Sequence, residues 1–516
     1  MDFFKTPELL QAAKSPPDLR KLLTPVRIAS FQAEAAGLRL LFATERVTDT
    51  IMQALFTLAQ DAQAVAQMKA MQDGERVNAI KGYDSENRPA LHTAMRDVFD
   101  DKKRPAIVQA AVDLAKKEIE KLKKFLPEVE KFTDIVQIGI GGSFLGPEAI
   151  YVGLQAYALQ GRRAHFISNV DPDETTKVLS SLDLSKTLII IVSKSGSTLE
   201  TVTNEALARD KLKDAGLNPK DHLIAVTGKG SPMDDPSKYR ASFYIWDYIG
   251  GRYSVTSMVG GVMLAFTLGI ETYLDFLRGA HEMDLVALET DPGKNLPLIG
   301  ALLGIWNRNF LNLPTVAIIP YAQALARFPA HLQQLDMESN GKHINKEGKV
   351  VDYNTGPIIW GEPGTNGQHS FFQMIHQGTT IIPLEIIGFK ETQYGEDLLV
   401  QGSYSQEKLL SNLFAQAIAL AQGQDNPNPN KVFTGNRPSS ILLAQKLDPF
   451  TIGKLLAYYE HKVVFQGFIW NINSFDQEGV QLGKKLATEM IKTFTEVREG
   501  KEPTYKLGEA YLKELN

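Results

Sequence analysis

Short apolar runs alternate with helical stretches through the first half of the chain. Strands are predicted near 134–140, 164–168, 187–192 and 222–227, and each run is followed by a turn and a helical stretch. A helix over 105–124 leads into the first strand. Strands that alternate with helices usually pair in the same direction, so this pattern predicts a parallel sheet with helices on both faces.

The alternation then repeats in the second half. A helical region over about 253–312 precedes a strand at 315–320, and another strand is predicted near 379–389, with helical segments between and after. The first 95 residues have Leu, Phe and Ala at helical spacing and few strand signals. We therefore predict an α/β fold with two parallel-rich α/β domains flanked by helices, an N-terminal helical region and a C-terminal helical arm.

Domain boundaries are placed where the pattern changes. A chain of 516 residues is expected to form two or more domains. The predicted division is an N-terminal helical region at 1–95 that packs on the large domain, a first α/β domain at 96–255, a second α/β domain at 256–500, and an arm at 501–516.

Composition narrows the class of protein. The net charge of −5 argues against nucleic acid as a partner, and the absence of cysteine excludes disulfides and thiolate nucleophiles. No basic segment followed by an apolar core opens residues 1–8, so no signal peptide is expected. The longest uncharged run, 253–270, contains two glycines and several hydroxyls and predicts a buried helix rather than a membrane span. We expect a cytoplasmic protein with no membrane partner.

A hydroxyl-rich turn follows the apolar strand at 187–192. A helix is predicted to begin near Thr198, so its free N–H groups and positive dipole end would face the turn. The turn also supplies hydroxyl donors, namely Ser193, Ser195, Ser197 and Thr198. This combination suits a phosphate dianion. The alternative is a simple capping box, because Ser197 and Glu200 have the required spacing.

A second glycine-rich turn, Gly139-Ile-Gly-Gly142-Ser143, also joins an apolar strand to a helix. Its spacing does not fit the dinucleotide fingerprint G-x-G-x-x-G, and the acidic residue expected at the end of the next strand is late, at Asp171. A dehydrogenase is therefore the weaker interpretation of this turn.

Glu338 is the candidate general base. Apolar residues at steps of three and four predict a helix over 322–338, and Asn340-Gly341 is a helix stop. Glu338 then lies in the last turn, beside the negative end of the helix dipole, where a carboxylate is disfavoured and is well suited to accept a proton. The alternative is a surface glutamate in a fraying turn.

His376 is the candidate proton donor. It falls in the last turn of a helix predicted over 368–377, where the protonated imidazole is favoured. The alternatives are C-terminal capping and a core histidine. His369 and His376 have no acidic partner at ligand spacing, so we predict no metal site.

Two further cations are candidates. Arg252 follows two glycines that would let a ligand approach the backbone, and a guanidinium is well shaped to stabilise an oxyanion. The alternative is a structural pair with a carboxylate. Ser474 and Gln477 have capping-box spacing, and Lys484 follows Gln477 by seven residues on the same helical stripe. Here the alternative is an ordinary cap and a solvated lysine.

Taken in order, these segments resemble the glucose-6-phosphate isomerase family. The run Asp247-x-Ile-Gly-Gly-Arg-Tyr-Ser254 fits one family signature. Two other stretches are similar to family motifs, Met337-Glu-Ser-Asn-Gly-Lys342 and Gly364-Thr-Asn-Gly-Gln-His-Ser-Phe371 with its continuation Ile375-His-Gln-Gly378. The resembling segments run from about residue 139 to 484 and leave the N-terminal region and the C-terminal arm unmatched.

The resemblance implies two sugar-isomerase (SIS-type) domains and reversible interconversion of glucose 6-phosphate and fructose 6-phosphate in glycolysis and gluconeogenesis. It implies no cofactor, and a homodimer in which His376 reaches the neighbouring subunit. It implies that Glu338 shuttles the proton, Arg252 stabilises the enediolate, and His376 and Lys484 assist ring opening. The implied substrate contacts are Gly142, Ser143, Ser193, Lys194, Ser195, Thr198 and Gln477.

Two departures from the family pattern stand out. Gln481 occupies a position where the family signature usually has Glu, and the turn Ser195-Gly196-Ser197 replaces the Thr-Phe-Thr of animal members. Three other functions stay open: an isomerase that also accepts mannose 6-phosphate, a non-catalytic sugar-phosphate-binding regulator, and a structural or signalling protein.

Overall fold

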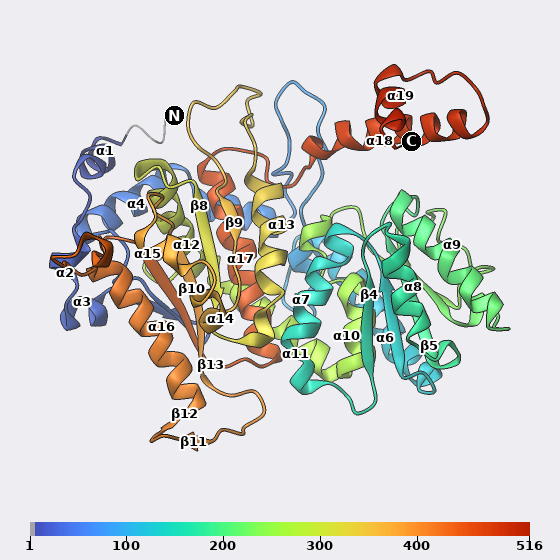
Figure 1. The fold of residues 1–516 in the computed structure, drawn as a ribbon, viewed down its shortest axis with the longest axis horizontal. Helices are drawn as coiled ribbons and strands as arrows, with labels where there is room; N and C mark the ends of the chain where they lie inside the picture. Colours follow the sequence, from blue (N-terminus) through green and yellow to red (C-terminus); the bar gives the residue numbers. More distant parts are fainter. Residues whose placement is uncertain (1–5, 516) are drawn as a thin grey trace. The chain divides into compact units, whose positions relative to one another are not determined.

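The computed structural model describes residues 6–515 (Figure 1). The chain forms two compact units, one ending at Ser474 and one beginning at Phe475. The expectation about a signal peptide concerns in part residues 1–5, which lie outside the described residues.

A five-stranded sheet forms the first α/β layer of the larger unit. All of its strands are parallel, in the order β4 (Arg163–Ile167), β3 (Asp134–Ile138), β5 (Thr187–Ser193), β6 (Leu223–Thr227) and β7 (Ala241–Tyr244). Every residue of β3, β5 and β6 is buried. The predicted strands from 134 to 227 are therefore confirmed, and the short edge strand β7 is an addition.

Helices cover both faces of this sheet, as predicted. On one face, side chains of α8 (Pro172–Ser180) and α9 (Leu199–Asp214) pack on Val136, Ile189 and Ile191. On the other face, Gln137 donates a hydrogen bond to the carbonyl of Val259 in α10 (Met258–Leu268). The remaining helices of this region are α6 (Ala106–Phe125) and α7 (Leu145–Gly153).

The second sheet has six strands and is mixed. Its order is β1 (Gln32–Ala35), β2 (Leu38–Leu41), β13 (Ser439–Lys446), β10 (Leu384–Glu391), β8 (Thr315–Pro320) and β9 (Ile358–Trp360). The last four are parallel, whereas β2 runs antiparallel to both β13 and β1. The N-terminal region, for which few strand signals were found, therefore contributes a hairpin to this sheet.

Helix α17 (Pro449–Ile469) is the central helix of the larger unit, and nearly every residue in it is buried. It packs against α11 (Ile270–Val286), α12 (Leu296–Ile305) and α13 (Phe328–Asn340). On the opposite side of the sheet, α16 (Ser405–Gln422) packs on β10. The short hairpin of β11 (Leu399–Val400) and β12 (Ser403–Tyr404) precedes α16.

The remaining α-helices of the larger unit have between 4 and 13 residues. Those of the N-terminal region are α1 (Pro7–Lys14), α2 (Leu19–Leu22), α3 (Pro25–Ser30), α4 (Asp49–Asp61) and α5 (Ala64–Gln72). The helix predicted over 368–377 is shorter than expected: α15 (Phe372–Gln377) covers its second part, and the separate helix α14 (Gly364–Gln368) ends where the predicted range begins. The helix predicted from 322 begins as a 3₁₀ turn, Gln323–Leu325, before α13.

The second unit is helical. It contains a 3₁₀ turn at Glu478–Val480, α18 (Gln481–Arg498) and α19 (Lys506–Lys513), and the two α-helices pack against each other. The predicted capping box at Ser474 and Gln477 is wrong. The helix begins at Gln481, and the Ser474 hydroxyl donates instead to Asn340 Oδ1 at 2.7 Å. Gln477 therefore precedes the helix and does not share a helical stripe with Lys484.

Within residues 6–515, every helix is too short or too polar to cross a membrane. The uncharged run at 253–270 forms the turn before α10 and α10 itself, all of whose residues are buried.

Candidate active site

Two turns meet at the carboxyl end of the five-stranded sheet. Strands β3 and β5 are adjacent and parallel, with Ile138 opposite Ile191, so the turns that follow them leave the sheet at the same edge. The first is a 3₁₀ turn, Gly141–Ser143, and the second is the hydroxyl-rich turn from Ser193 to Thr198. This edge is where open α/β sheets bind ligands.

The hydroxyl-rich turn is a compact cluster of donors. Ser193 Oγ lies 2.9 Å from Thr198 Oγ1 and 3.4 Å from Ser195 Oγ, and the Gly196 N–H donates to Ser193 Oγ at 3.1 Å. The residue before α9 is Thr198, whose side chain makes no cap, and the Ser197 hydroxyl donates to Ser195 Oγ at 3.2 Å. The alternative capping box of Ser197 and Glu200 therefore does not form. The hydroxyls and the first N–H groups of α9 are arranged to hold an anion.

Lys194 supplies the positive charge of this turn. Its ammonium group donates to the carbonyl of Ile249 at 2.9 Å and approaches that of Asp247 at 3.5 Å. Burial, helped by the charge of Arg88, lowers the pKa of Lys194 to about 8. The lysine therefore connects the turn after β5 to the segment that leads into Arg252.

Gly142 brings the first turn against Gly251 and Arg252. A Cβ added at Gly142 would lie 2.2 Å from the carbonyl carbon and oxygen of Gly251 and 2.7 Å from the Arg252 nitrogen. Only glycine permits so close an approach of two backbones. The predicted residues Gly142, Ser143 and Arg252 are thereby brought together.

Glu338 and Arg252 face each other. Glu338 lies in the last turn of α13, as predicted, and its carboxylate Oε2 lies 3.6 Å from Arg252 Nη1. The Glu338 side chain is 23% exposed, whereas that of Arg252 is 1% exposed. A partly accessible carboxylate beside a buried, permanently charged guanidinium can accept a proton from a bound substrate and transfer the negative charge to it.

The end of α13 is closed by Lys342. Its ammonium group donates to the carbonyls of Glu338 at 2.8 Å and Ser339 at 2.9 Å. These are orphan carbonyls at a helix C-terminus, where a cation is stabilising. The turn that carries Glu338 is therefore fixed rather than frayed.

The contacts of His376 are with residues other than Glu338 and Arg252. Its Nε2 shares a hydrogen bond of 2.7 Å with Gln416 Oε1 on α16, and its ring packs against Phe372 and Phe433. Gln477 and Lys484 belong to the second unit, where Lys484 lies in the first turn of α18. The catalytic roles of these three residues stay predictions.

Gln334 is a candidate that sequence analysis missed. It lies one turn before Glu338 on α13, and its amide nitrogen is 3.2 Å from the position of a Cβ at Gly141. Its amide oxygen is buried without a hydrogen-bond partner among the described residues. An unpaired buried acceptor at a site is ready for a ligand. The four-residue spacing from Glu338 was the available signal, since it places both side chains on one helix face.

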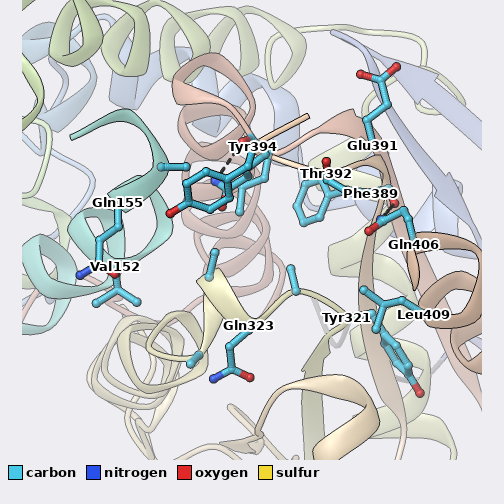
Figure 2. Close-up of a pocket in the computed structure, with 16 residues that line it drawn as sticks. Val152, Gln155, Tyr321, Gln323, Phe389, Glu391, Thr392, Tyr394, Gln406 and Leu409 are labelled. Atoms are coloured by element: carbon cyan, nitrogen blue, oxygen red, sulfur yellow. Dashed lines mark hydrogen bonds between the residues drawn. The ribbon is translucent and has the colours of Figure 1, made fainter. Parts of the chain in front are cut away.

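A second pocket lies at the carboxyl end of the six-stranded sheet (Figure 2). It has a volume of about 510 Å³ and is lined by aliphatic side chains together with amides and aromatic rings, among them Gln155, Gln323, Gln406, Tyr321, Phe389 and Tyr394. Among the described residues that line it, Glu391 is the one charged side chain. A phosphate dianion would meet no cation there.

Asp97, Asp100 and His281 place potential metal-ligand atoms within 4.8 Å of one another. Lys102 Nζ lies 2.8 Å from Asp97 Oδ1, and Arg104 Nε lies 2.7 Å from Asp97 Oδ2. Arg104 also pairs with Asp100. We assign no metal to this cluster because cationic side chains already pair with its carboxylates.

Comparisons with known proteins show the family. The family model for phosphoglucose isomerase matches residues 41–503. A glucose-6-phosphate isomerase from Protochlamydia amoebophila (strain UWE25) is 58% identical over 514 residues, which cover 99% of this chain and 96% of the relative. One from Desulfotalea psychrophila is 54% identical over 506 residues, covering 96% and 94%.

Solved structures give the same result. The crystal structure of a glucose-6-phosphate isomerase from Chlamydia trachomatis D/UW-3/Cx has a TM-score of 0.96 and 48% identity, and the match covers 100% of this chain and 98% of that one. A hypothetical protein from Thermus thermophilus has a TM-score of 0.70 and 26% identity, covering 88% and 99%. On the family model and on relatives of this identity and coverage, the chain belongs to the phosphoglucose isomerase family.

Proposed function

We propose that this chain interconverts glucose 6-phosphate and fructose 6-phosphate reversibly, as an aldose–ketose isomerase in glycolysis and gluconeogenesis. The observation that carries the proposal is the facing pair of Glu338 and Arg252, 3.6 Å apart. Arg252 adjoins Gly142, at the sheet edge where the hydroxyl-rich turn also lies. One carboxylate, one cation and an anion cradle are what an enediolate mechanism requires.

The phosphate is held at the turn after β5. The hydroxyls of Ser193, Ser195 and Thr198 and the first N–H groups of α9 donate to its oxygens, and the Lys194 ammonium adds a positive charge. Gly142 and Ser143 border the sugar from the neighbouring turn. This grip leaves the carbonyl end of the open chain to reach the Glu338 carboxylate.

The proton transfer exchanges one ion pair for another. Glu338 removes the proton from C2 of the open-chain aldose, becomes neutral, and leaves the negative charge on the enediolate oxygens. Arg252 then pairs with the enediolate in place of the carboxylate, so the site's net charge is unchanged. Within the enediolate the hydroxyl proton moves from O2 to O1, so the negative charge passes to O2. Glu338 then returns its proton to C1, the C2 carbonyl forms, and the product is the ketose. Arg252 therefore interacts more strongly with the intermediate than with the neutral carbonyl substrate, which lowers the barrier.

The proposal also includes opening of the sugar ring, which gives the open-chain substrate. His376 and Lys484 move protons between the ring oxygen and the anomeric hydroxyl, and Gln477 contacts the substrate. The enzyme acts as a cytoplasmic homodimer in which His376 of the partner subunit completes each site. These steps use side chains alone, so the proposal needs no cofactor, nucleic acid or membrane.

The first experiment measures turnover of fructose 6-phosphate in the presence of EDTA for the wild type and for Glu338→Gln. The wild type is expected to be active, and Glu338→Gln to lose about 10³-fold or more in kcat while still binding the sugar phosphate in calorimetry. Glu120→Gln is the matched control because this glutamate is on the surface, 60% exposed. Retained turnover in Glu338→Gln would contradict the assignment; binding without wild-type turnover would favour a regulator.

The dimer is tested by complementation. His376→Ala and Glu338→Gln are each expected to be inactive alone. When they are co-expressed, a mixed dimer contains one site with an intact Glu338 and an intact His376 of the partner subunit, so activity should return. No recovery in isolated mixed dimers would place His376 within its own subunit's site.

A further inference from the structure

Structural hydrogen bonds hold the guanidinium of Arg252 through its Nε and Nη2 atoms. Its Nε donates to Ser339 Oγ at 2.7 Å, and its Nη2 donates to the carbonyl of Ser474 at 2.6 Å. The third nitrogen, Nη1, is the one that faces Glu338 Oε2. Because the guanidinium is planar and rigid, fixing Nε and Nη2 also fixes the direction in which Nη1 points.

Ser339 is the residue after the base. It is fully buried, and its hydroxyl also lies 2.9 Å from the Tyr253 hydroxyl. The Tyr253 ring is itself stacked on His92, with ring centroids 4.6 Å apart. Burial raises the pKa of Tyr253 to about 12, so the phenol stays neutral at working pH. The Ser339 hydroxyl is therefore fixed between the cation and a buried phenol.

Ser474, whose carbonyl accepts from Arg252 Nη2, is itself held by Asn340, the residue after Ser339. Ser474 Oγ donates to Asn340 Oδ1 at 2.7 Å, and Asn340 Nδ2 donates to the carbonyl of Val463 on α17 at 2.9 Å. Gly467 permits this contact, because a Cβ there would lie 1.9 Å from Ser474 Oγ. Three consecutive residues of α13 thus supply the base, the anchor of Arg252 Nε, and the support of the carbonyl that holds Arg252 Nη2.

We propose that Ser339 is a positioning residue, which acts through Arg252 to aim its guanidinium at the enediolate. The inference rests on the proposed roles of Glu338 and Arg252. Glu338 and Ser339 are adjacent on one helical turn whose carbonyls bind Lys342, so the same short segment carries the base and holds the cation.

The test is Ser339→Ala, assayed with fructose 6-phosphate. We expect kcat to fall about 10- to 100-fold, the range for a lost hydrogen bond to a charged group, with KM changed less than about threefold because the phosphate grip is untouched. Affinity for a phosphorylated sugar acid, whose carboxylate stands in for the enediolate, should fall by the same factor as kcat/KM. A wild-type kcat, or an equal loss in KM alone, would overturn the proposal.

A double-mutant cycle separates positioning from general damage. If Ser339 acts through Arg252, then Ser339→Ala combined with Arg252→Met should be no slower than Arg252→Met alone. Multiplicative losses would show that Ser339 does something else. Full activity in Arg252→Met would overturn the proposed catalytic role of Arg252 as well, whereas an inactive Arg252→Met with a normal Ser339→Ala would overturn only this inference.

Ser257→Ala is the matched control for loss of a buried hydroxyl. Ser257 is 2% exposed, caps α10 and bonds to the carbonyl of Ser254 at 2.6 Å. The Ser257→Ala substitution should lower the melting temperature while leaving kcat within about twofold, because a helix cap stabilises the fold without orienting a catalytic group. Should Ser339→Ala fail to fold, Ser339→Cys keeps a weak acceptor of similar size and is expected to give an intermediate kcat; a wild-type kcat in it would also overturn the proposal.

Discussion

The carboxyl ends of the two sheets occupy equivalent places in the architecture and carry different chemistry. At the five-stranded sheet, the turns after β3 and β5 offer hydroxyls, a helix N-terminus and the ammonium of Lys194. At the six-stranded sheet, the segments after β8 and β10 line a pocket of about 510 Å³ with amides, aromatic rings and Glu391 (Figure 2).

The difference teaches that topology sets where a site can lie and that turn chemistry sets what it binds. Both edges are formed by parallel strands, yet an anion is stabilised only where N–H and O–H donors converge without a facing carboxylate. The second edge instead presents groups that suit uncharged surfaces. We therefore expect substitutions at the first edge to change sugar-phosphate turnover and those at the second to leave it unchanged.

Among the substitutions that compare the two sheet edges, Gly142→Ala is expected to have the largest effect. The added Cβ would lie 2.2 Å from the Gly251 carbonyl, so the two turns must separate and Arg252 must move with them. A displacement of a catalytic group by about 1 Å costs about 100-fold, and we expect kcat/KM to fall by at least that factor.

Gly293→Ala is the control for this substitution. Gly293 lies in an exposed loop, and the nearest atom to its added Cβ is Asp291 Oδ1 at 3.3 Å, the end of a flexible side chain. Steady-state kinetics should match the wild type. A Gly142→Ala enzyme with normal kcat/KM would show that the contact between the two turns is dispensable.

Lys194→Met should have an intermediate effect. Removing the one ammonium of the turn is expected to raise KM for fructose 6-phosphate about 10-fold while leaving kcat within about threefold, because the charge binds the phosphate in ground and transition states alike. Initial rates over a range of substrate concentrations decide this. An unchanged KM would remove Lys194 from the phosphate site.

The same residue predicts a pH dependence. The pKa of Lys194 is lowered to about 8, so the free enzyme carries the ammonium charge below that pH and loses it as pH rises through it. Wild-type kcat/KM should therefore fall above about pH 8, since this ratio reports groups of the free enzyme. Lys194→Met should lack that alkaline limb; an identical limb in both proteins would assign it to another group.

The parts of the fold that the sequence predicted are those with local causes. β5 is a continuous apolar run with all seven residues buried, and it was predicted almost to its ends. β1 and β2 were missed because β2 is fixed by pairing with β13, far along the chain, rather than by its own short pattern. The capping box at Ser474 failed for a similar reason, because Asn340 on α13 takes the serine hydroxyl.

The residues of the candidate site likewise fall into those that the sequence predicted and those that it did not. Glu338, Arg252, Gly142 and the hydroxyl-rich turn stand out because each lies in a run of unusual residues, and the structure places Glu338 against Arg252 and Gly142 beside it. Ser339 and Gln334 do not stand out, since a serine and a glutamine in a helix have many ordinary explanations. Their roles depend on which helix face is buried against Arg252 and the Gly141 turn, and that is settled only by tertiary packing.

The smallest expected effect is at the second edge, and it completes the comparison. Gln323 is an exposed lining residue of the second pocket, and Gln323→Ala should leave kcat and KM within about twofold, as for a surface change away from the site. The matching substitution at the first edge is Thr198→Val. It keeps the side-chain shape and removes a hydroxyl that lies 2.9 Å from Ser193 Oγ. That variant should raise KM and weaken inhibition by inorganic phosphate about 10-fold, the order expected for one hydrogen bond to a charged group. If Gln323→Ala weakened phosphate inhibition as much as Thr198→Val, the second edge would also take part in binding the anion, and the contrast drawn from the turn chemistry would be wrong.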